Sequence, residues 1–297
     1  MKIRRRFDSD VPSGSVLQCQ QAGAWNDLHD VSGSLQWLHN LAPEKPDPEV
    51  GALPLSPLSF RDCMLYERHW VQSSRGYAKR FMPAAYRLAR SYQFVSRRTF
   101  PAFRPNALWE RQPIYYFGNH MTIVPSGTVV TTPSYTRALD YELELGWVLS
   151  KPLFNATPEE ALQAIGGFVV INDFSARDVQ RAEMQSGLGP QKSKHFLSSM
   201  SQTMVTANEI LPCINELAAY VEIKGRIVTR TSTQGMRYGV GEVLAHLSLS
   251  EHLYPGELIA SGTLPSGSGM ETDHWLQPGD VLRLVIEPIG ETFHEIR

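Results

Sequence analysis

The segment 139–149 alternates between apolar and acidic side chains, which is the period of a half-buried β-strand. Its apolar face carries Tyr141, Leu143 and Leu145, and its acidic face carries Asp140, Glu142 and Glu144. A continuous apolar run at 168–171 predicts a fully buried strand that ends at Asn172-Asp173. The middle of the chain is therefore expected to contain two buried strands with acidic residues on them or directly after them.

Other segments also have the composition of strands. These segments lie at 122–124, 128–132, 219–223, 226–231 and 281–286. Pro125-Ser126-Gly127 predicts a turn between the first two, and Lys224-Gly225 predicts a hairpin between the third and the fourth. The segment 281–286 follows Pro278-Gly279-Asp280 and is predicted to be the last strand.

Two helix starts are visible between the strands. Thr157 is a good N-cap, because Pro158 follows it and two glutamates occupy the first turn, and this helix is predicted to end at Gly166-Gly167. Ser175 is predicted to cap a second helix that runs through Arg177 and Gln180.

The amino-terminal part of the chain has a different texture. Scattered Gly, Pro and Ser residues through 1–60 predict short strands and loops, and mixed aromatic, basic and Ala residues at 76–98 predict a helical insertion or a mobile lid. A more regular region begins near Tyr115. The pattern predicts a β-rich α+β fold in which a smaller amino-terminal domain over 1–110, with the helical insertion, precedes a second domain over 111–297.

Composition narrows the class of protein. The 297 residues carry 28 Lys+Arg against 30 Asp+Glu, a formal net charge of −2, which argues against nucleic acid and anionic membranes as partners. No apolar run approaches the roughly 20 residues of a membrane-spanning helix, and no apolar segment follows the basic amino terminus. The cysteines (Cys19, Cys63 and Cys213) are too few and too dispersed for a disulfide framework or a zinc site. A protein of the reducing cytoplasm is expected.

The acidic residues are the first candidates for chemistry. Glu142 and Glu144 lie at i and i+2 of a strand, so their side chains point the same way, and a solvent-facing polar stripe is one interpretation. However, like charges on one strand face repel one another, and Asp173 ends a very apolar strand, where a charge needs a partner. A hard divalent cation with oxygen ligands would resolve both problems.

Basic residues are placed where they could reach the same point. Arg177 and Gln180 lie one helical turn apart and near Asp173, where an arginine forms either a substrate clamp or a structural ion pair. Lys194 lies in a loop that could reach them. Upstream, Asp62 and His69 are seven residues apart, which on a helix is two turns and would place both on one face.

These residues together resemble the fumarylacetoacetate hydrolase family. The likeness runs from Tyr115 to the end and is carried by Asp140–Leu145, Asn172–Gln180, Lys194-His195-Phe196, Ser261-Gly262-Thr263 and Pro278-Gly279-Asp280. Each motif alone is weak, whereas the five in this order are specific. The resemblance implies a mixed β-sandwich roll, a homodimer, and a divalent metal such as Mg²⁺, Ca²⁺ or Mn²⁺.

The resemblance also implies roles for particular residues. It assigns Glu142, Glu144, Asp173 and Asp62 as metal ligands, His69 as the catalytic histidine and Glu271 as the residue that orients it. It assigns Tyr116 and Thr263 to substrate binding, and Arg177, Gln180 and Lys194 to holding or polarising the substrate. The spacing of Asp62 and His69 resembles the fumarylacetoacetase-like hydrolase branch.

The sequence departs from the pattern of fumarylacetoacetase at two positions. Met184 stands where a substrate-binding tyrosine is expected, and Asn119 replaces an arginine. The segment 71–111 matches no part of the family pattern. Fumarylacetoacetate itself is therefore not the expected substrate, while the metal site is expected to be intact.

The expected activity is metal-dependent hydrolysis of a carbon–carbon bond in a small dicarbonyl substrate, a β-diketone or an acylpyruvate, with His69 activating water. The alternative within the family is a decarboxylase, isomerase or tautomerase that acts through the same enolate. A metal-binding protein without catalysis is a second alternative, which the set Asp62, His69 and Lys194 disfavours. A serine hydrolase is disfavoured because no Gly-x-Ser-x-Gly elbow is present.

Overall fold

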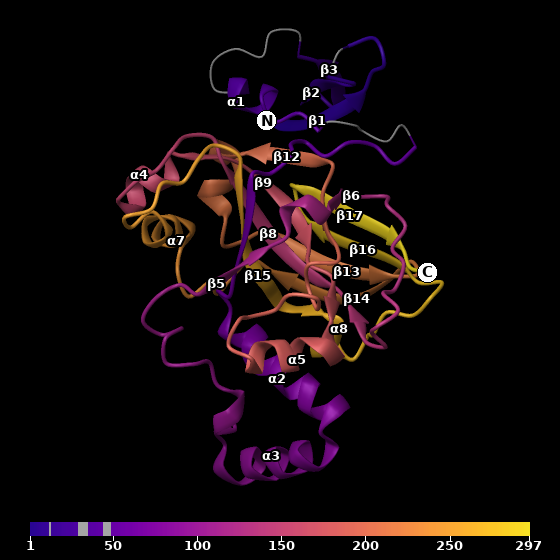
Figure 1. Cartoon of the computed structure of the whole chain (residues 1–297), viewed down its shortest axis with the longest axis vertical. Helices are drawn as coiled ribbons and strands as arrows, with labels where there is room; N and C mark the ends of the chain where they lie inside the picture. Colours follow the sequence, from indigo (N-terminus) through magenta and orange to yellow (C-terminus); the bar gives the residue numbers. More distant parts are fainter. Residues whose placement is uncertain (12, 29–34, 44–48) are drawn as a thin grey trace.

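The computed structural model describes residues 1–11, 13–28, 35–43 and 49–297 (Figure 1). In this part of the chain the main sheet has eleven strands. Nine follow one another as β3 (Ala24–Asp27), β2 (Ser15–Gln21), β1 (Lys2–Phe7), β12 (Thr203–Thr206), β9 (Ile165–Asn172), β8 (Glu142–Leu149), β15 (Glu257–Ser268), β4 (Ser59–Cys63) and β5 (Tyr115–Gly118). The other two strands are β11 (Ser198–Met200), which pairs with β9, and β6 (Ile123–Pro125), which pairs with β11.

A second sheet packs on one face of the central strands. It has the order β14 (Arg226–Ser232), β13 (Ala218–Ile223), β16 (Val281–Ile286) and β17 (Gly290–Glu295). Leu143, Leu145 and Trp147 of β8 lie in one hydrophobic cluster with Val221 and Leu284 of this sheet. Each such buried side chain contributes roughly 1.5–3 kcal/mol, so the apolar face of β8 fixes which side of the strand faces this core. The predicted β-rich α+β fold with sandwiched sheets is confirmed.

The longer helices gather at one end of the molecule. These are α2 (Glu67–Phe81), α3 (Pro83–Ser96) and α5 (Arg177–Gln185), and Figure 1 shows α3 beyond α2 at the end opposite β1–β3. The others are α1 (Gln36–His39), α4 (Pro158–Leu162), α6 (Ala207–Ile210), α7 (Val240–Leu247) and α8 (Gly269–Thr272), with 3-10 turns η2 (Pro101–Phe103), η3 (His120–Thr122) and η4 (Leu211–Cys213). In the described part of the chain, no helix is long and apolar enough to span a bilayer.

Several predicted elements are confirmed. Thr157 caps α4 in a capping box with Glu160, as its sequence predicts. β13 and β14 form the predicted hairpin, and Lys224 and Gly225 both have positive φ (51° and 74°), as its tight turn requires. The helical insertion predicted at 76–98 corresponds to the second half of α2 and the whole of α3.

Other expectations are corrected. The helix that begins at Thr157 ends at Leu162, and Gly166-Gly167 belong to β9. Glycine is required there by close packing and not by a helix end. A Cβ at Gly166 would lie 2.4 Å from the Trp37 ring, and one at Gly167 would lie 2.8 Å from the Met204 side chain. Ser175 does not cap α5. Instead it lies in the short strand β10 (Ser175–Ala176), which pairs with β7 (Leu139–Asp140), and its hydroxyl donates to the carbonyl of Asp173.

Three further differences concern strands. The segment 128–132 contributes only the isolated bridge Val130–Ile296, and its expected partner, β6, pairs in parallel with β11. β17 follows the strand that was predicted to be the last. Part of the loop texture predicted over 1–60, at residues 12, 29–34 and 44–48, lies outside the described residues. The division of the chain at residue 110 stays a prediction.

Candidate metal and catalytic site

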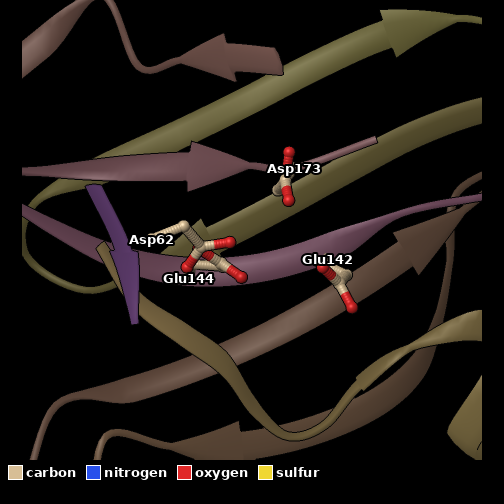
Figure 2. A group of neighbouring side chains, drawn as sticks. All are labelled: Asp62, Glu142, Glu144 and Asp173. Atoms are coloured by element: carbon tan, nitrogen blue, oxygen red, sulfur yellow. The ribbon is translucent and has the colours of Figure 1, made fainter. Parts of the chain in front are cut away.

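The order of the central strands brings four carboxylates together. β4, β15, β8 and β9 are neighbours, and their registers place Asp62 opposite Ala260, Thr263 opposite Glu144 and Leu143 opposite Asn172. The ligand atoms of Asp62, Glu142, Glu144 and Asp173 all lie within 4.8 Å of one another. Figure 2 shows the four side chains around one space, with Asp62 from β4, Glu142 and Glu144 from β8, and Asp173 directly after β9.

This cluster is buried, so the interpretation of Glu142 and Glu144 as a solvent-facing stripe is wrong. The four residues are at most 4% exposed. Asp62 Oδ1 and Glu144 Oε2 are buried without a hydrogen-bond partner. Burial, together with the neighbouring Asp173 for Asp62 and the neighbouring Asp62 for Glu144, holds the pKa of each carboxyl well above its usual range. Four converging oxygen donors, two with unpartnered atoms, fit a hard divalent cation.

Asp140 does not join this cluster, although it shares the acidic face of the same segment. Its carboxylate accepts from Arg177 Nε at 2.8 Å and from the backbone N–H groups of Gly269 and Met270 at 2.8 and 3.0 Å. Asp140 therefore fixes Arg177 and the start of α8 at the same time. The sequence placed it on the correct face, but its partners are distant in the chain.

Arg177, at the start of α5, reaches the cluster as predicted. Its Nη2 donates to Glu142 Oε1 at 2.6 Å, and its Nη1 donates to Gln180 Oε1 at 3.0 Å. Burial opposes the charged form, but Glu142 and then Asp140 raise the pKa of Arg177 above its ordinary value. Arg177 therefore pairs with Asp140 and Glu142, and its role toward a substrate stays a prediction. Arg177 and Gln180 both line the adjoining cavity.

Lys194 reaches the same point from its loop, where its ammonium contacts both Glu142 and Asp173. Burial alone would lower the pKa of Lys194, but Asp173 and Glu142 raise it, so the side chain stays charged. Likewise, burial would raise the pKa of Glu142, but Arg177 and then Lys194 bring it below its ordinary value. The raised pKa of Lys194 and the lowered pKa of Glu142 have the same cause, the ionic network that these residues form with Arg177 and Asp173.

Two side chains that the sequence did not indicate, Ser198 and Glu183, hold Asp173 and the loop of Lys194. Ser198 donates to Asp173 Oδ1 at 2.9 Å. The carboxylate of Glu183 accepts from the backbone N–H groups of residues 191, 192 and 193 at 2.8, 2.8 and 3.1 Å, and from the Ser193 hydroxyl at 2.6 Å. The partners in these contacts are 8 to 25 residues apart in the chain, so no local sequence pattern predicts them.

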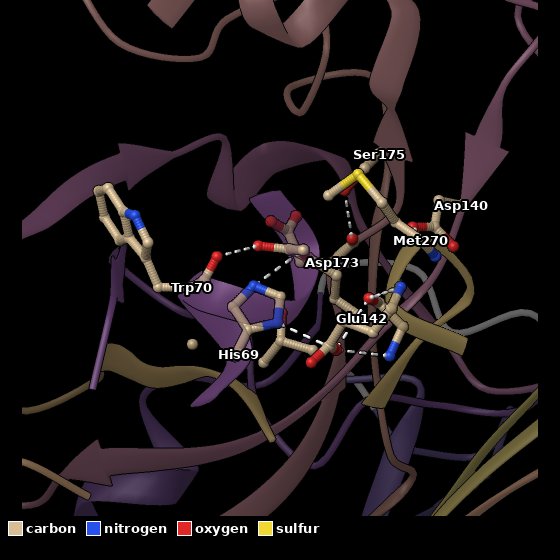
Figure 3. Close-up of polar contacts among 12 residues, drawn as sticks. His69, Trp70, Asp140, Glu142, Asp173, Ser175 and Met270 are labelled. Atoms are coloured by element: carbon tan, nitrogen blue, oxygen red, sulfur yellow. Dashed lines mark hydrogen bonds and ion pairs between the residues drawn. The ribbon is translucent and has the colours of Figure 1, made fainter. Parts of the chain in front are cut away.

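His69 lies beside the carboxylates with Glu271 behind it. Its Nδ1 is 3.0 Å from Glu271 Oε2 and its Nε2 is 3.8 Å from Glu142 Oε1 (Figure 3). His69 is 2% exposed, and the Glu271 carboxylate also accepts from the backbone N–H groups of Ser266 and Ser268, which fix it in place. The residue predicted to orient His69 is therefore in contact with it.

The seven-residue spacing of Asp62 and His69 is not two turns of one helix. Asp62 lies in β4 and His69 in the first turn of α2, after the tight connection 64–66. Both side chains nevertheless line the same cavity, because the end of β4 and the first turn of α2 both border it. The pairing was right and the local structure assumed for it was wrong.

The carboxylates open into a cavity of about 570 Å³. All eleven predicted site residues except Asp173 and Glu271 line it, and those two contact residues that do. Tyr116 donates to Asp173 Oδ2 at 2.6 Å, and Thr263 Oγ1 is 3.5 Å from Glu144 Oε1. Met184 lies on the cavity wall, whereas Asn119 is not among the lining residues and donates to the carbonyl of His195.

Sequence comparison finds a matching family model, described as the carboxyl-terminal part of fumarylacetoacetate (FAA) hydrolase, over residues 88–297. A mitochondrial oxaloacetate tautomerase of Homo sapiens is 30% identical over 159 residues, which are 53% of this chain and 71% of that protein. An oxaloacetate tautomerase of Bacillus subtilis (strain 168) is 29% identical over 187 residues, which are 62% of this chain and 61% of that protein.

Solved structures share the fold at low sequence identity. A fumarylacetoacetate hydrolase from Exiguobacterium antarcticum superposes with a TM-score of 0.69 at 21% identity, covering 100% of this chain and 99% of that one. A fumarylpyruvate hydrolase from Pseudomonas aeruginosa, in complex with Mn²⁺ and pyruvate, has a TM-score of 0.59 at 20% identity, covering 81% of this chain and 96% of that one.

Proposed function

The chain belongs to the fumarylacetoacetate hydrolase family, and from that premise we propose that it hydrolyses a carbon–carbon bond in an acylpyruvate or β-diketone. One observation carries the proposal. A buried His69–Glu271 pair stands over the four-carboxylate cluster and faces its cavity. A general base held in a fixed orientation beside a metal-type cluster is the equipment needed to activate water.

Glu271 Oε2 lies 3.0 Å from His69 Nδ1, but Nδ1 makes no hydrogen bond in the described part of the chain. The proposal requires the tautomer in which His69 carries its proton on Nδ1, facing the Glu271 carboxylate. Nε2 then has the free lone pair and faces the carboxylate cluster, since Glu142 Oε1 is 3.8 Å away. A divalent cation held by Asp62, Glu142, Glu144 and Asp173 would supply positive charge that stabilises an enolate.

The proposed reaction moves both protons of the attacking water. Nε2 of His69 takes one proton from water while the water oxygen bonds to the attacked carbonyl carbon. The bond between that carbon and its α-carbon then breaks, and the electron pair becomes the enolate of the leaving ketone. His69 returns its proton to the α-carbon, which gives the ketone, and the new carboxylic acid releases the second water proton to solvent and leaves as a carboxylate.

The remaining residues have positioning roles in this proposal. Gln180 accepts from Arg177 through its oxygen, so its NH₂ group is the donor available to a substrate oxygen. Lys194 adds a fixed ammonium beside Glu142 and Asp173, where negative charge on a substrate would develop. Tyr116 and Thr263 line the same cavity and complete the polar end.

Tautomerisation of an oxo acid is the second candidate. It is favoured by the curated relatives, which are oxaloacetate tautomerases. The same Nε2 would move a proton between carbon and oxygen without attack by water, and no carbon–carbon bond would break.

Incubation with an acylpyruvate and Mn²⁺ in ¹⁸O-water separates the two. Hydrolysis incorporates one solvent oxygen into the new carboxylate, measured by mass spectrometry, whereas tautomerisation gives no cleavage products. The variant His69→Ala is expected to lose cleavage by at least about 100-fold, and His252→Ala, which removes an exposed histidine away from the site, is the control. Full activity of His69→Ala with metal bound would exclude the proposed base.

The identity of the metal and homodimerisation are proposals that rest on the family resemblance, and cytoplasmic location is a proposal that rests on the few, dispersed cysteines. Metal titration and light scattering test the first two.

A further inference from the structure

The cavity over the carboxylates has a second, chemically different end. Its outer wall is built by α2, α3 and the η2 turn, with Trp70, Tyr77, Met82, Ala85, Phe100 and Phe103 among the lining side chains. Apart from Trp70, these residues lie in the segment 71–111. The expectation that this segment matches no part of the family is wrong from residue 88 onward, where the matching family model begins. The cavity is continuous, so a molecule whose polar end lies at the carboxylates also reaches this wall.

The face of α5 that lines the cavity gives a measure of the distance between the two ends. Arg177, Gln180, Arg181 and Met184 all line it, which is the i, i+3, i+4, i+7 pattern of one helix face. Seven residues of helix at 1.5 Å each separate Arg177 from Met184 by roughly 10 Å. Beyond a dicarbonyl unit bound near Gln180, the space that remains before Met184 is therefore about as long as a phenyl ring or a six-carbon chain.

Charge is nearly absent from the outer end. Among the described lining residues beyond the ionic network of the inner end, Arg181 is the one charged side chain. Its guanidinium lies 5.5 Å from the centre of the Tyr77 ring, and its Nη1 is 2.6 Å from Met82 Sδ. These contacts turn the cation toward the apolar wall and make the arginine part of that wall.

From this apolar outer wall, continuous with the proposed catalytic end, we infer that the substrate carries an uncharged apolar group, aryl or bulky alkyl, on its acyl side. Such a group displaces water from Trp70, Tyr77, Phe100 and Phe103, whereas a second carboxylate would lose its hydration against them with a single arginine to offset the loss. The inner end already holds a surplus of buried carboxylates over cations, which adds to the cost of a dianionic substrate.

This inference rests on the proposed function, and a substrate series tests it. We compare kcat/KM, with Mn²⁺ present, for acylpyruvates that carry a methyl, a phenyl or a fumaryl acyl group. The phenyl compound is expected to exceed the methyl compound by at least about tenfold, because the ring buries roughly 100 Å² more apolar surface, and the fumaryl compound is expected to rank below the phenyl one. A preference for the fumaryl compound that Arg181→Gln removes would overturn the inference and make Arg181 a carboxylate ligand.

Two adjacent alanines of α3 provide a matched pair of variants. Ala84 and Ala85 are both exposed, but only Ala85 lines the cavity. Ala85→Trp is expected to lower kcat/KM for the phenyl compound by about tenfold and to leave that for the methyl compound within about twofold, because it fills only the outer end. Ala84→Trp is expected to change neither. Equal losses with both substrates, or equal effects of the two variants, would overturn the inference.

Binding without turnover distinguishes failure of the inference from failure of the proposed function. The metal-free protein is mixed with acetophenone and fumarate, and binding is followed by saturation-transfer NMR. Acetophenone is expected to bind, and to lose its signal with Ala85→Trp but not with Ala84→Trp. If it binds in this way and no acylpyruvate is cleaved, the apolar site stands and the hydrolase proposal fails. If acylpyruvates are cleaved without preference and acetophenone does not bind, the hydrolase proposal stands and the inference of an apolar substrate group fails.

Discussion

The two ends of the cavity are built in opposite ways. The carboxylate end stands on four adjacent strands of the main sheet, and its four acids are at most 4% exposed. Glu142 and Asp173 contact cations, whereas Asp62 and Glu144 each have a buried oxygen without a hydrogen-bond partner. The outer end stands on α2 and α3, which lie at the edge of the molecule in Figure 1 and pack there through a small cluster of Ala78, Ala89 and Phe103. The carboxylate cluster is thus placed on the main sheet and the apolar wall on a helical attachment, with His69, in the first turn of α2, between the two. Changes at the inner end should abolish activity, while changes at the outer end should redirect it.

The largest effect is expected from removing one cluster carboxylate. Glu144→Gln removes a metal ligand and should lower activity by about 1,000-fold, since a metal ion contributes several kcal/mol to such chemistry. The same change should stabilise the metal-free protein, by about 1 kcal/mol or more, because burial and Asp62 already disfavour the charge of Glu144. Mn²⁺ titration calorimetry and thermal unfolding measure the two effects.

Glu222→Gln is the matched control, because Glu222 is an acid of the second sheet that pairs with Arg283 at 3.5 Å, away from the cluster. It should leave activity and metal binding unchanged. A Glu144→Gln protein that unfolds earlier than the parent would show that the cluster is a structural network and not a site held open for a cation.

The rigidity of the inner end is tested at Gly262, the residue before Thr263. Its φ is +75°, and a Cβ there would lie 2.3 Å from the carbonyl oxygen of Cys63. Gly225 has nearly the same φ, +74°, with open space around it. Gly225→Ala should therefore cost about 1 kcal/mol of unfolding free energy and Gly262→Ala about 3 kcal/mol or more, measured by urea unfolding. Equal costs would mean that β15 can move away from β4 freely.

The sheet beneath the cluster also predicts a pH dependence. Burial lowers the pKa of His294 to about 4, and its ring lies 2.7 Å from both the Thr128 carbonyl and the Ser199 hydroxyl. In the unfolded chain His294 binds a proton near pH 6.5, whereas in the folded protein its ring stays neutral until the pH is close to 4. The stability that the neutral ring contributes is therefore complete above pH 6.5 and is lost as the pH falls toward 4. The loss should reach about 3 kcal/mol, and His294→Gln should flatten that part of the curve in urea unfolding at pH 4.5 to 7. An unchanged slope in the variant would assign the dependence to other groups.

The same contrast explains what the sequence could predict. Glu142, Glu144 and Asp173 were found because strand alternation and a charge at the end of an apolar run are local patterns. The resemblance to the family, and not the spacing, identified Glu271 as the partner of His69. Asp140 and Glu183 were missed as positioning groups, because their partners lie 37 and 8–10 residues away and depend on tertiary structure.

The outer end was not predictable in the same way. Helical character at 76–98 was recognised, but which residues line the cavity depends on how α2 and α3 pack against α5 and η2. Ala84 and Ala85 are adjacent and identical in the sequence, and only the structure separates them. A cavity wall formed by aromatic and Ala residues has no motif, whereas a metal cluster requires particular residue types.

The smallest effect expected at the inner end concerns the attachment of Lys194. The Glu183 carboxylate accepts from three backbone N–H groups and the Ser193 hydroxyl. Burial acts to raise the pKa of Glu183, but these hydrogen bonds together bring it below its ordinary value. In Glu183→Gln one acceptor oxygen becomes an NH₂ group that faces N–H donors, so the loop should loosen and Lys194 should lose its fixed position. Steady-state kinetics should show kcat reduced by about tenfold with KM nearly unchanged, and Glu159→Gln on exposed α4 should show neither effect. A lower thermal stability with unchanged kcat would mean that Lys194 is held by Glu142 and Asp173 alone, and the loop would then belong with the adaptable outer end.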